Sequence, residues 1–215
     1  MKFSLQEMIF MNSVAKGPSP FALELPLPKS NEKEAMIENT FKSLQDKEIL
    51  DADRKLTAAG IVPIQIFEQY KNAKEHILLN RMRICRTNNP TLIVIAPGET
   101  EYEMAAVHPA ILLEILLRKI SYMCGAQDKS AQPFPEVQIA YDIWSQDIRA
   151  FGDQNLFAGT YTGQQPVTQK AYYWNQNQGF VYDINTHMQR QLHPREMRME
   201  LMHLLGSFET QEVSA

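Results

Sequence analysis

Residues 81–120 read RMRICRTNNPTLIVIAPGETEYEMAAVHPAILLEILLRKI, and residues 170–208 read KAYYWNQNQGFVYDINTHMQRQLHPREMRMELMHLLGSF. Each stretch contains three short segments with the composition and alternation of β-strands, and each then reaches a His-Pro pair and an apolar helical pattern. Pro fits the first turn of a helix because the backbone N–H that it lacks would be unpaired there. The two stretches therefore predict the same strand–strand–strand–helix unit twice.

The predicted strands of the first copy are followed by a helix at His108-Pro109, and those of the second copy by a helix at His193-Pro194. Turns are expected at Asn88-Asn89-Pro90 and at Asn175 to Gly179. The strands are Met82–Arg86, Thr91–Ala96 and Tyr102–Val107 in the first copy, and Ala171–Trp174, Phe180–Ile184 and Met188–Leu192 in the second.

Internal repetition predicts an α+β fold, in which a pseudo-two-fold duplication of this unit shares a central antiparallel sheet. A chain of 215 residues can bury one substantial core, so we expect a single domain over 1–215. Its halves would be 1–124 and 136–215, joined by the Ala-, Gln-, Ser- and Pro-rich segment 125–135.

Extra helices are predicted before the first copy. The apolar spacing in Met1–Ala15 fits an amphipathic helix, and Met36, Ile37, Phe41 and Leu44 share a face of the next. A third helix is expected from Pro63 and is extended in this prediction to His76–Leu79. Residues 136–151 are also predicted to be helical, and Gly159–Gln165 is predicted to be a flexible polar segment.

The composition indicates a soluble cytoplasmic protein. A net charge of −4 argues against a nucleic-acid-binding face, which is usually basic. Gln6, Glu7 and Asn12 interrupt the apolar stretch that a signal peptide would need. The run Ile111–Ile120 is too short to cross a bilayer, so no membrane insertion is expected.

The sequence carries no recognisable catalytic or metal-binding motif. The five histidines lack zinc-ligand spacing, and no P-loop, G-x-S-x-G or G-x-G-x-x-G is present. His108 and His193 are predicted to mark strand-to-helix boundaries, and Glu101 and Glu103 to lie on a solvated strand face. Cys85 and Cys124 are expected to be reduced, and contact between them stays open. We therefore expect no catalytic residues, no metal and no cofactor, although an enzyme whose residues converge only in three dimensions remains an alternative.

Aromatic and methionine side chains on the predicted strands are the candidate binding residues, because such side chains are favoured at interfaces as well as in cores. The first copy contributes Tyr102 and Met104. The second contributes Tyr172, Trp174, Phe180 and Tyr182. These six residues are predicted to form one partner-binding face.

A winged-helix-like DNA-binding regulator is the alternative function. Residues Leu44–Lys74 have a helix–turn–helix arrangement, and phosphate contacts would fall to Lys71 and Lys74. Both lysines are offset by Glu68 and Glu75, so a packed helical pair is the favoured interpretation.

The order of elements resembles the EspG family of type VII (ESX) secretion chaperones and its relatives in Gram-positive bacteria. The resemblance covers nearly the whole chain: a short helix, a Pro-rich stretch, helix Ile37–Leu50, the phrase Asp51–Leu56, a further helix and then the two copies. It implies two quasi-symmetric halves around a central sheet, a cytoplasmic location and no catalysis. It also implies an elongated helical secreted protein or heterodimer as the partner, whose exposed apolar tip would be masked. The oligomeric state is left open.

Overall fold

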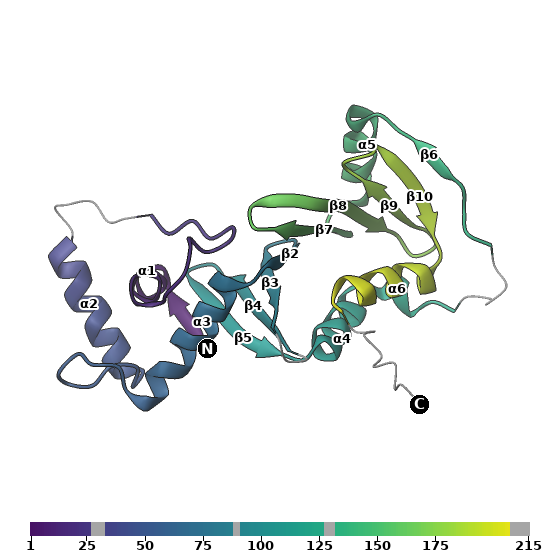
Figure 1. Cartoon of the computed structure of the whole chain (residues 1–215). Helices are drawn as coiled ribbons and strands as arrows, with labels where there is room; N and C mark the ends of the chain where they lie inside the picture. Colours follow the sequence, from purple (N-terminus) through teal and green to yellow (C-terminus); the bar gives the residue numbers. More distant parts are fainter. Residues whose placement is uncertain (27–32, 88–90, 127–131, 207–215) are drawn as a thin grey trace, which may run out of the picture. The chain divides into compact units, whose positions relative to one another are not determined.

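The structure is a computed structural model that describes residues 1–26, 33–87, 91–126 and 132–206 (Figure 1). The turn predicted at 88–90 and part of the segment 125–135 lie outside the described residues. The chain divides into two compact units. The first comprises Met1–His76 and Arg81–Ala106, and the second comprises Ile77–Asn80 and Val107–Ala215. Because these units interleave along the sequence, the single domain with halves 1–124 and 136–215 stays a prediction.

The first unit combines helices with antiparallel strands in the order β1-β5-β4-β3. Its elements are β1 (Lys2–Ser4), α1 (Leu5–Val14), α2 (Lys33–Asp46), α3 (Ala58–Asn72), β3 (Met82–Arg86), β4 (Leu92–Pro97) and β5 (Glu101–Val107). The strand β2 (Glu75–Leu79) crosses the boundary, with Glu75 and His76 in the first unit and Ile77–Leu79 in the second.

A capping box starts α1 and also ties it to α2. The Ser4 hydroxyl accepts a hydrogen bond from the Glu7 backbone N–H at 3.2 Å, and the Glu7 carboxylate accepts one from the Ser4 N–H at 2.6 Å. The buried Glu7 side chain also meets the Lys47 ammonium at 2.6 Å and accepts a hydrogen bond from the Ser43 hydroxyl at 2.8 Å. These bonds satisfy a carboxylate that would otherwise be costly to bury.

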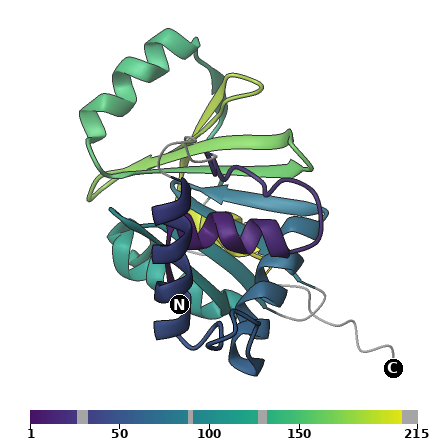
Figure 2. The ribbon, with the colours of Figure 1, turned by 90° about the vertical axis from the view of Figure 1, so that its left-hand side faces the viewer.

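The second unit contains helices and the strand order β2-β7-β8-β9-β10-β6. Its further elements are α4 (Pro109–Lys119), the 3-10 helix η1 (Ser121–Cys124), β6 (Glu136–Gln138), α5 (Tyr141–Asp147), the 3-10 helix η2 (Ile148–Phe151), β7 (Asn155–Thr162), β8 (Gln165–Trp174), β9 (Gly179–Asp183), β10 (Met188–Leu192) and α6 (Pro194–Leu204). Figure 2 shows β7 and β8 as two long neighbouring green strands.

The two halves of the sequence share a longer order of elements than predicted. One strand and its following helices precede a run of four strands and a closing helix, first in β1 to α4 and again in β6 to α6. In each case the early strand pairs with the last strand of the run, β1 with β5 and β6 with β10. The predicted α+β class with an antiparallel sheet is confirmed, whereas an ancestral duplication stays a prediction.

Several secondary-structure predictions are wrong. The third helix begins at Ala58, so Pro63 lies inside α3 and not at its start. Residues His76–Leu79 belong to the strand β2, because Ala73 ends α3 in an extended conformation and the chain then pairs in a sheet. Residues 136–151 divide into β6, α5 and η2, so one helix does not span them. The polar segment Gly159–Gln165 lies in the β7–β8 hairpin, where backbone pairing with the neighbouring strand orders it.

The predicted boundary role of the two histidines is confirmed. His108 is the N-cap of α4, and its ring Nδ1 accepts a hydrogen bond from the Ala110 N–H at 3.2 Å. His193 is the N-cap of α6, and its own N–H donates to the Glu196 carboxylate at 2.8 Å. Each helix then starts with the expected proline.

Candidate functional site

The strand register of the second unit separates its side chains into two faces. Residues directly opposite each other in an antiparallel pair point to the same side of the sheet. One face carries the row Phe157, Ala171, Tyr182, Gln189 and Val137. The opposite face carries the row Leu156, Tyr172, Val181, Arg190 and Glu136. We call them the α5 face and the α6 face, after the helix that contacts each of them.

A network of charged hydrogen bonds centred on Glu200 of α6 covers the α6 face. The Glu200 carboxylate accepts from the Tyr172 hydroxyl at 2.8 Å, from the Arg190 guanidinium at 2.9 Å and from the Lys170 ammonium at 3.0 Å. Arg190 also donates to Glu196 at 2.8 Å. Burial and the negative Glu200 raise the pKa of Tyr172 well above its ordinary value, so this hydroxyl remains a donor.

Close packing completes the cover of the α6 face near the β8–β9 turn. The ring of Tyr122 in η1 lies so near Gly179 that a Cβ there would come within 2.3 Å of it. The Tyr122 hydroxyl donates to the Leu192 carbonyl at 2.5 Å, and Leu192 is fully buried. This face is therefore covered over Leu156, Tyr172 and Val181, which are all buried.

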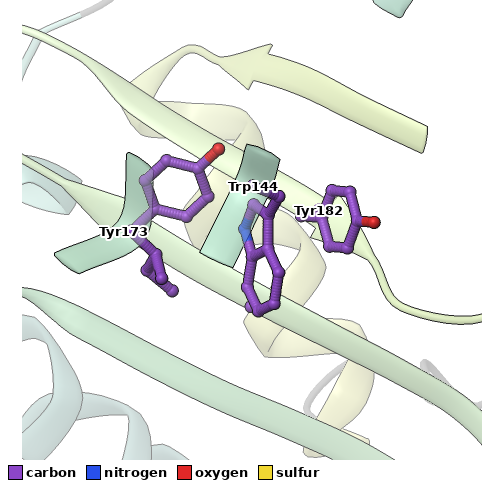
Figure 3. Packing of buried hydrophobic residues seen from close by; sticks show 5 residues of the cluster. Trp144, Tyr173 and Tyr182 are labelled. Atoms are coloured by element: carbon purple, nitrogen blue, oxygen red, sulfur yellow. The ribbon is translucent and has the colours of Figure 1, made fainter. Parts of the chain in front are cut away.

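An aromatic stack attaches α5 to the opposite face (Figure 3). The indole of Trp144 lies parallel to the Tyr182 ring, with centroids 4.4 Å apart and an interplanar angle of 4°. Trp144 also meets the edge of Phe157 at 6.4 Å and Tyr141 at 5.3 Å. Together with Ile148, Ala171 and Tyr173 it forms a buried cluster. The stack fixes the short helix over the middle of the row.

Large apolar side chains remain exposed around this anchored helix. The row's two ends, Val137 and Phe157, are 55% and 40% exposed. On α5 itself, Tyr141 and Ile143 are each 54% exposed. We call these four residues the α5 surface. Exposed apolar side chains that gather on one part of a monomer can mark an interaction site. Tyr141 and Phe157 both lie against Trp144, so the α5 surface is the candidate protein-binding site.

The predicted binding residues of the second copy do not share one face. Tyr172 and Trp174 lie on the α6 face, opposite Val181 and Gly179, whereas Phe180 and Tyr182 lie on the α5 face. Tyr172, Trp174 and Tyr182 are buried, and Phe180 is half-buried. The expectation of one exposed aromatic face is therefore wrong, because these rings fill the two cores on either side of the strands. A partner-binding role for them is left as a prediction.

Tyr102 and Met104, the predicted binding residues of the first copy, lie in the first unit on β5. Met104 is fully buried, while Tyr102 is half-buried and pairs with Phe3 of β1. Glu101 and Glu103 are exposed, in agreement with the solvated strand face that was predicted.

Val137, Tyr141 and Ile143 fall within the single helix predicted over 136–151, and that prediction did not identify them as exposed. A usable signal was present, because apolar residues alternate at 137, 139, 141 and 143 and then follow helical spacing at 144, 148 and 151. This change from a period of two to a helical period marks the boundary between β6 and α5.

The other chemistry of the described residues is sparse. Within the described ranges, no group of three or more His, Cys, Asp or Glu side chains is placed to hold a metal ion. Cys85 and Cys124 are both free thiols, the first buried and the second exposed. No helix in the described part of the chain is both long and apolar enough to span a membrane.

The helical pair α2 and α3 weakens the DNA-binding alternative. Lys71 is 5% exposed, and its ammonium donates to the carbonyls of Ala15 at 2.9 Å and Asn12 at 3.3 Å. It therefore closes the end of α1 and is not available to a phosphate.

Comparison with known proteins gives a family and a fold. A family model described as "Domain of unknown function (DUF5081)" matches residues 1–183. Comparison with curated proteins gives no match. Among solved structures, that of the Mycobacterium tuberculosis type VII secretion system chaperone EspG5 in complex with the PE25-PPE41 dimer is similar, with a TM-score of 0.55 and 7% sequence identity. The similarity covers 95% of this chain and 95% of that chain, and at this identity it establishes the fold alone.

Proposed function

This chain belongs to the DUF5081 family, and we propose that it is a non-catalytic cytoplasmic chaperone or adaptor for a helical substrate of a type VII secretion system. The observation that carries the proposal is the fold similarity to the EspG5 chaperone, which extends over 95% of both chains. A match of that extent includes the sheets and helices of both units, so it is not confined to one common supersecondary motif.

The surface chemistry of the second unit supports a binding role. A protein that holds another protein needs exposed apolar area, and the α5 surface offers four large side chains that are each at least 40% exposed. The buried cluster beneath it consists of aromatic and aliphatic residues. Binding without chemistry accounts for both features.

The proposed partner is a helical secreted protein or heterodimer. The solved EspG5 structure is a complex with the PE25-PPE41 dimer. In our proposal, this protein holds a partner of comparable kind and covers its apolar tip until export. A cytoplasmic location is part of the same proposal.

Co-purification tests the function. The full chain would be co-expressed with each small helical secretion substrate encoded beside it, singly and in pairs, and analysed by size-exclusion chromatography. We expect one substrate or pair to co-elute with the chain and to raise its melting temperature, because a ligand that binds only the folded state stabilises it. If no substrate changes either the elution or the melting temperature, the proposed function is wrong.

A further inference from the structure

We propose that the α5 surface is the docking site for the partner, and that it binds an amphipathic helix whose apolar stripe is flanked by Lys or Arg. The inference rests on the proposed chaperone function and specifies where and what that function binds. All of the residues involved belong to the second unit.

The helix α5 covers only part of the α5 face. Trp144 stacks on Tyr182 in the middle of the row, and the flanking Val137 and Phe157 remain exposed. At the β7 end of the opposite face, Leu156 is 4% exposed, whereas Phe157 on the α5 face is 40% exposed. The row therefore continues beyond its cover, and a partner's apolar side chains can extend that cover.

The exposed side chains of α5 belong to a helix that is anchored by buried residues. Trp144 and Ile148 are 2% and 9% exposed and fix the inner side of α5 and η2. Tyr141 and Ile143, each 54% exposed, lie on the two flanks of this anchored helix, because residues two apart on a helix point in nearly opposite directions. Apolar anchors on an ordered element lose little conformational entropy when they bind, which favours affinity.

The charge near the apolar side chains is acidic. The segment 137–154 contains three acidic residues, Asp142, Asp147 and Asp153, against one basic residue, Arg149. Asp142 and Asp147 are exposed on α5. An apolar centre with an acidic margin complements an apolar stripe with basic flanks, and such complementarity selects the partner and speeds its association.

A helix suits this site better than an added strand. The edge strand β6 has three residues, which is too short a template for the backbone pairing that strand addition requires. The exposed groups are side chains that point away from the sheet and from α5. The i, i+3, i+4 anchors of an amphipathic helix match that arrangement.

Two synthetic helical peptides test the proposal with the full chain. Both carry a Leu stripe, flanked by Lys in one peptide and by Glu in the other, and binding is measured by isothermal titration calorimetry at low and high salt. We expect the Lys peptide to bind at least about tenfold more tightly than the Glu peptide, with a difference that shrinks as salt rises. Equal affinities, or no binding of the Lys peptide, would overturn the proposal.

Variants of the α5 surface locate the binding. Ile143→Glu is expected to weaken the Lys peptide at least about tenfold, because it places an uncompensated charge against the apolar stripe. The control Val62→Glu changes a side chain of similar exposure, 50%, on α3 in the other unit and should leave the affinity unchanged. The double variant Asp142→Lys with Asp147→Lys should reverse the preference between the peptides. An unchanged affinity in Ile143→Glu, or an unchanged preference in the double variant, would refute the site.

The failure of this inference can be separated from the failure of the proposed function. If a secretion substrate co-purifies with the wild-type chain and equally well with Ile143→Glu, the chaperone function stands and the docking surface is wrong. If no substrate co-purifies, the function is wrong whatever the peptides show.

Discussion

The two faces of the sheet in the second unit differ in the groups that surround their tyrosines. On the α6 face, the Tyr172 hydroxyl is hydrogen-bonded to a carboxylate that two cations also share. On the α5 face, Tyr182 packs its ring against an indole, and the neighbouring Tyr173 hydroxyl finds no partner among the described residues. The Tyr182 hydroxyl is hydrogen-bonded to the Ile139 carbonyl at 3.1 Å and to His187 Nδ1 at 2.8 Å. The first face is closed by a network centred on a carboxylate, and the second by ring stacking together with these two hydrogen bonds.

This difference indicates which face can accept a partner. A polar network of fixed geometry resists repacking, because each bond depends on the position of the others. A stacked aromatic layer with exposed apolar ends can accept further apolar side chains without breaking a bond. Four experiments test this difference between the α5 face and the α6 face, and they follow in order of expected effect.

Trp144→Ala should produce the largest loss of stability. Truncating a fully buried aromatic side chain costs about 3–5 kcal/mol, and here it would also free α5 from Tyr182. Equilibrium denaturation would measure the change in the free energy of unfolding, with Trp144→Phe as the milder control. A loss below about 1 kcal/mol would show that the stack does not anchor α5.

Glu200→Ala should have the next largest effect. It removes the acceptor of Tyr172, whose hydroxyl is buried, and leaves Arg190 and Lys170 with fewer partners. Glu200 is 22% exposed, so solvent reduces the penalty, and we expect a loss of about 2 kcal/mol. The same denaturation assay would compare it with Glu200→Gln, which keeps an acceptor. If Ala and Gln behave alike, the hydrogen bond to Tyr172 contributes nothing.

An alkaline titration should distinguish the tyrosines of the two faces. Burial, and after it Glu200, raises the pKa of Tyr172 well above the ordinary value of 10.0, so the folded state keeps this hydroxyl protonated. The resulting stability is complete below pH 10 and falls as the pH rises above it, since the unfolded chain then releases the proton first.

The sensitivity of this titration to Glu200 is the useful measurement. Glu200→Gln should lower the pKa of Tyr172 but not that of Tyr173, whose pKa is raised by burial and by Asp147. Tyrosinate absorbance recorded against pH would show one ionisation step moving to lower pH. A titration curve identical to that of the wild type would contradict the proposed electrostatic role of Glu200.

Ile143→Ser should have the smallest effect on stability. Ile143 is 54% exposed, and surface substitutions away from special features change the free energy of unfolding by about 0.5 kcal/mol or less. The same variant should nevertheless weaken peptide binding in calorimetry, although less than Ile143→Glu does. A large loss of stability would place Ile143 in the core of the folded chain and remove it from the binding surface.

Much of the strand and helix pattern could be predicted from sequence. The apolar run of β4, the strand β10 and the His-Pro starts of α4 and α6 all have strong local signals, and each appears where it was expected. The strand β2 was missed because His76–Leu79 continues the apolar pattern of α3, and only pairing with other strands identifies it.

The assignment of side chains to faces failed because of one turn residue. The prediction placed the turn at 175–179, whereas the structure closes it at 175–178, with the Asn175 N–H donating to the Gln178 carbonyl at 2.9 Å. Gly179 then pairs with Trp174, and Phe180 pairs with Tyr173 on the other face. Since side chains alternate along a strand, a shift of one residue exchanges the two faces. Local sequence could not supply that register.

The early strands β1 and β6 have a consequence for the order of folding during synthesis. Phe3 of β1 pairs with Tyr102, so at 5–20 residues per second this strand stays unpaired for roughly 5–20 seconds while about a hundred residues are made. The corresponding interval for β6, between the synthesis of Val137 and that of its partner Gln189, is about half as long. Both strands therefore pair only after the last strand of their run has been made, and until then the ribosome-bound chain carries β1 and β6 without their partner strands.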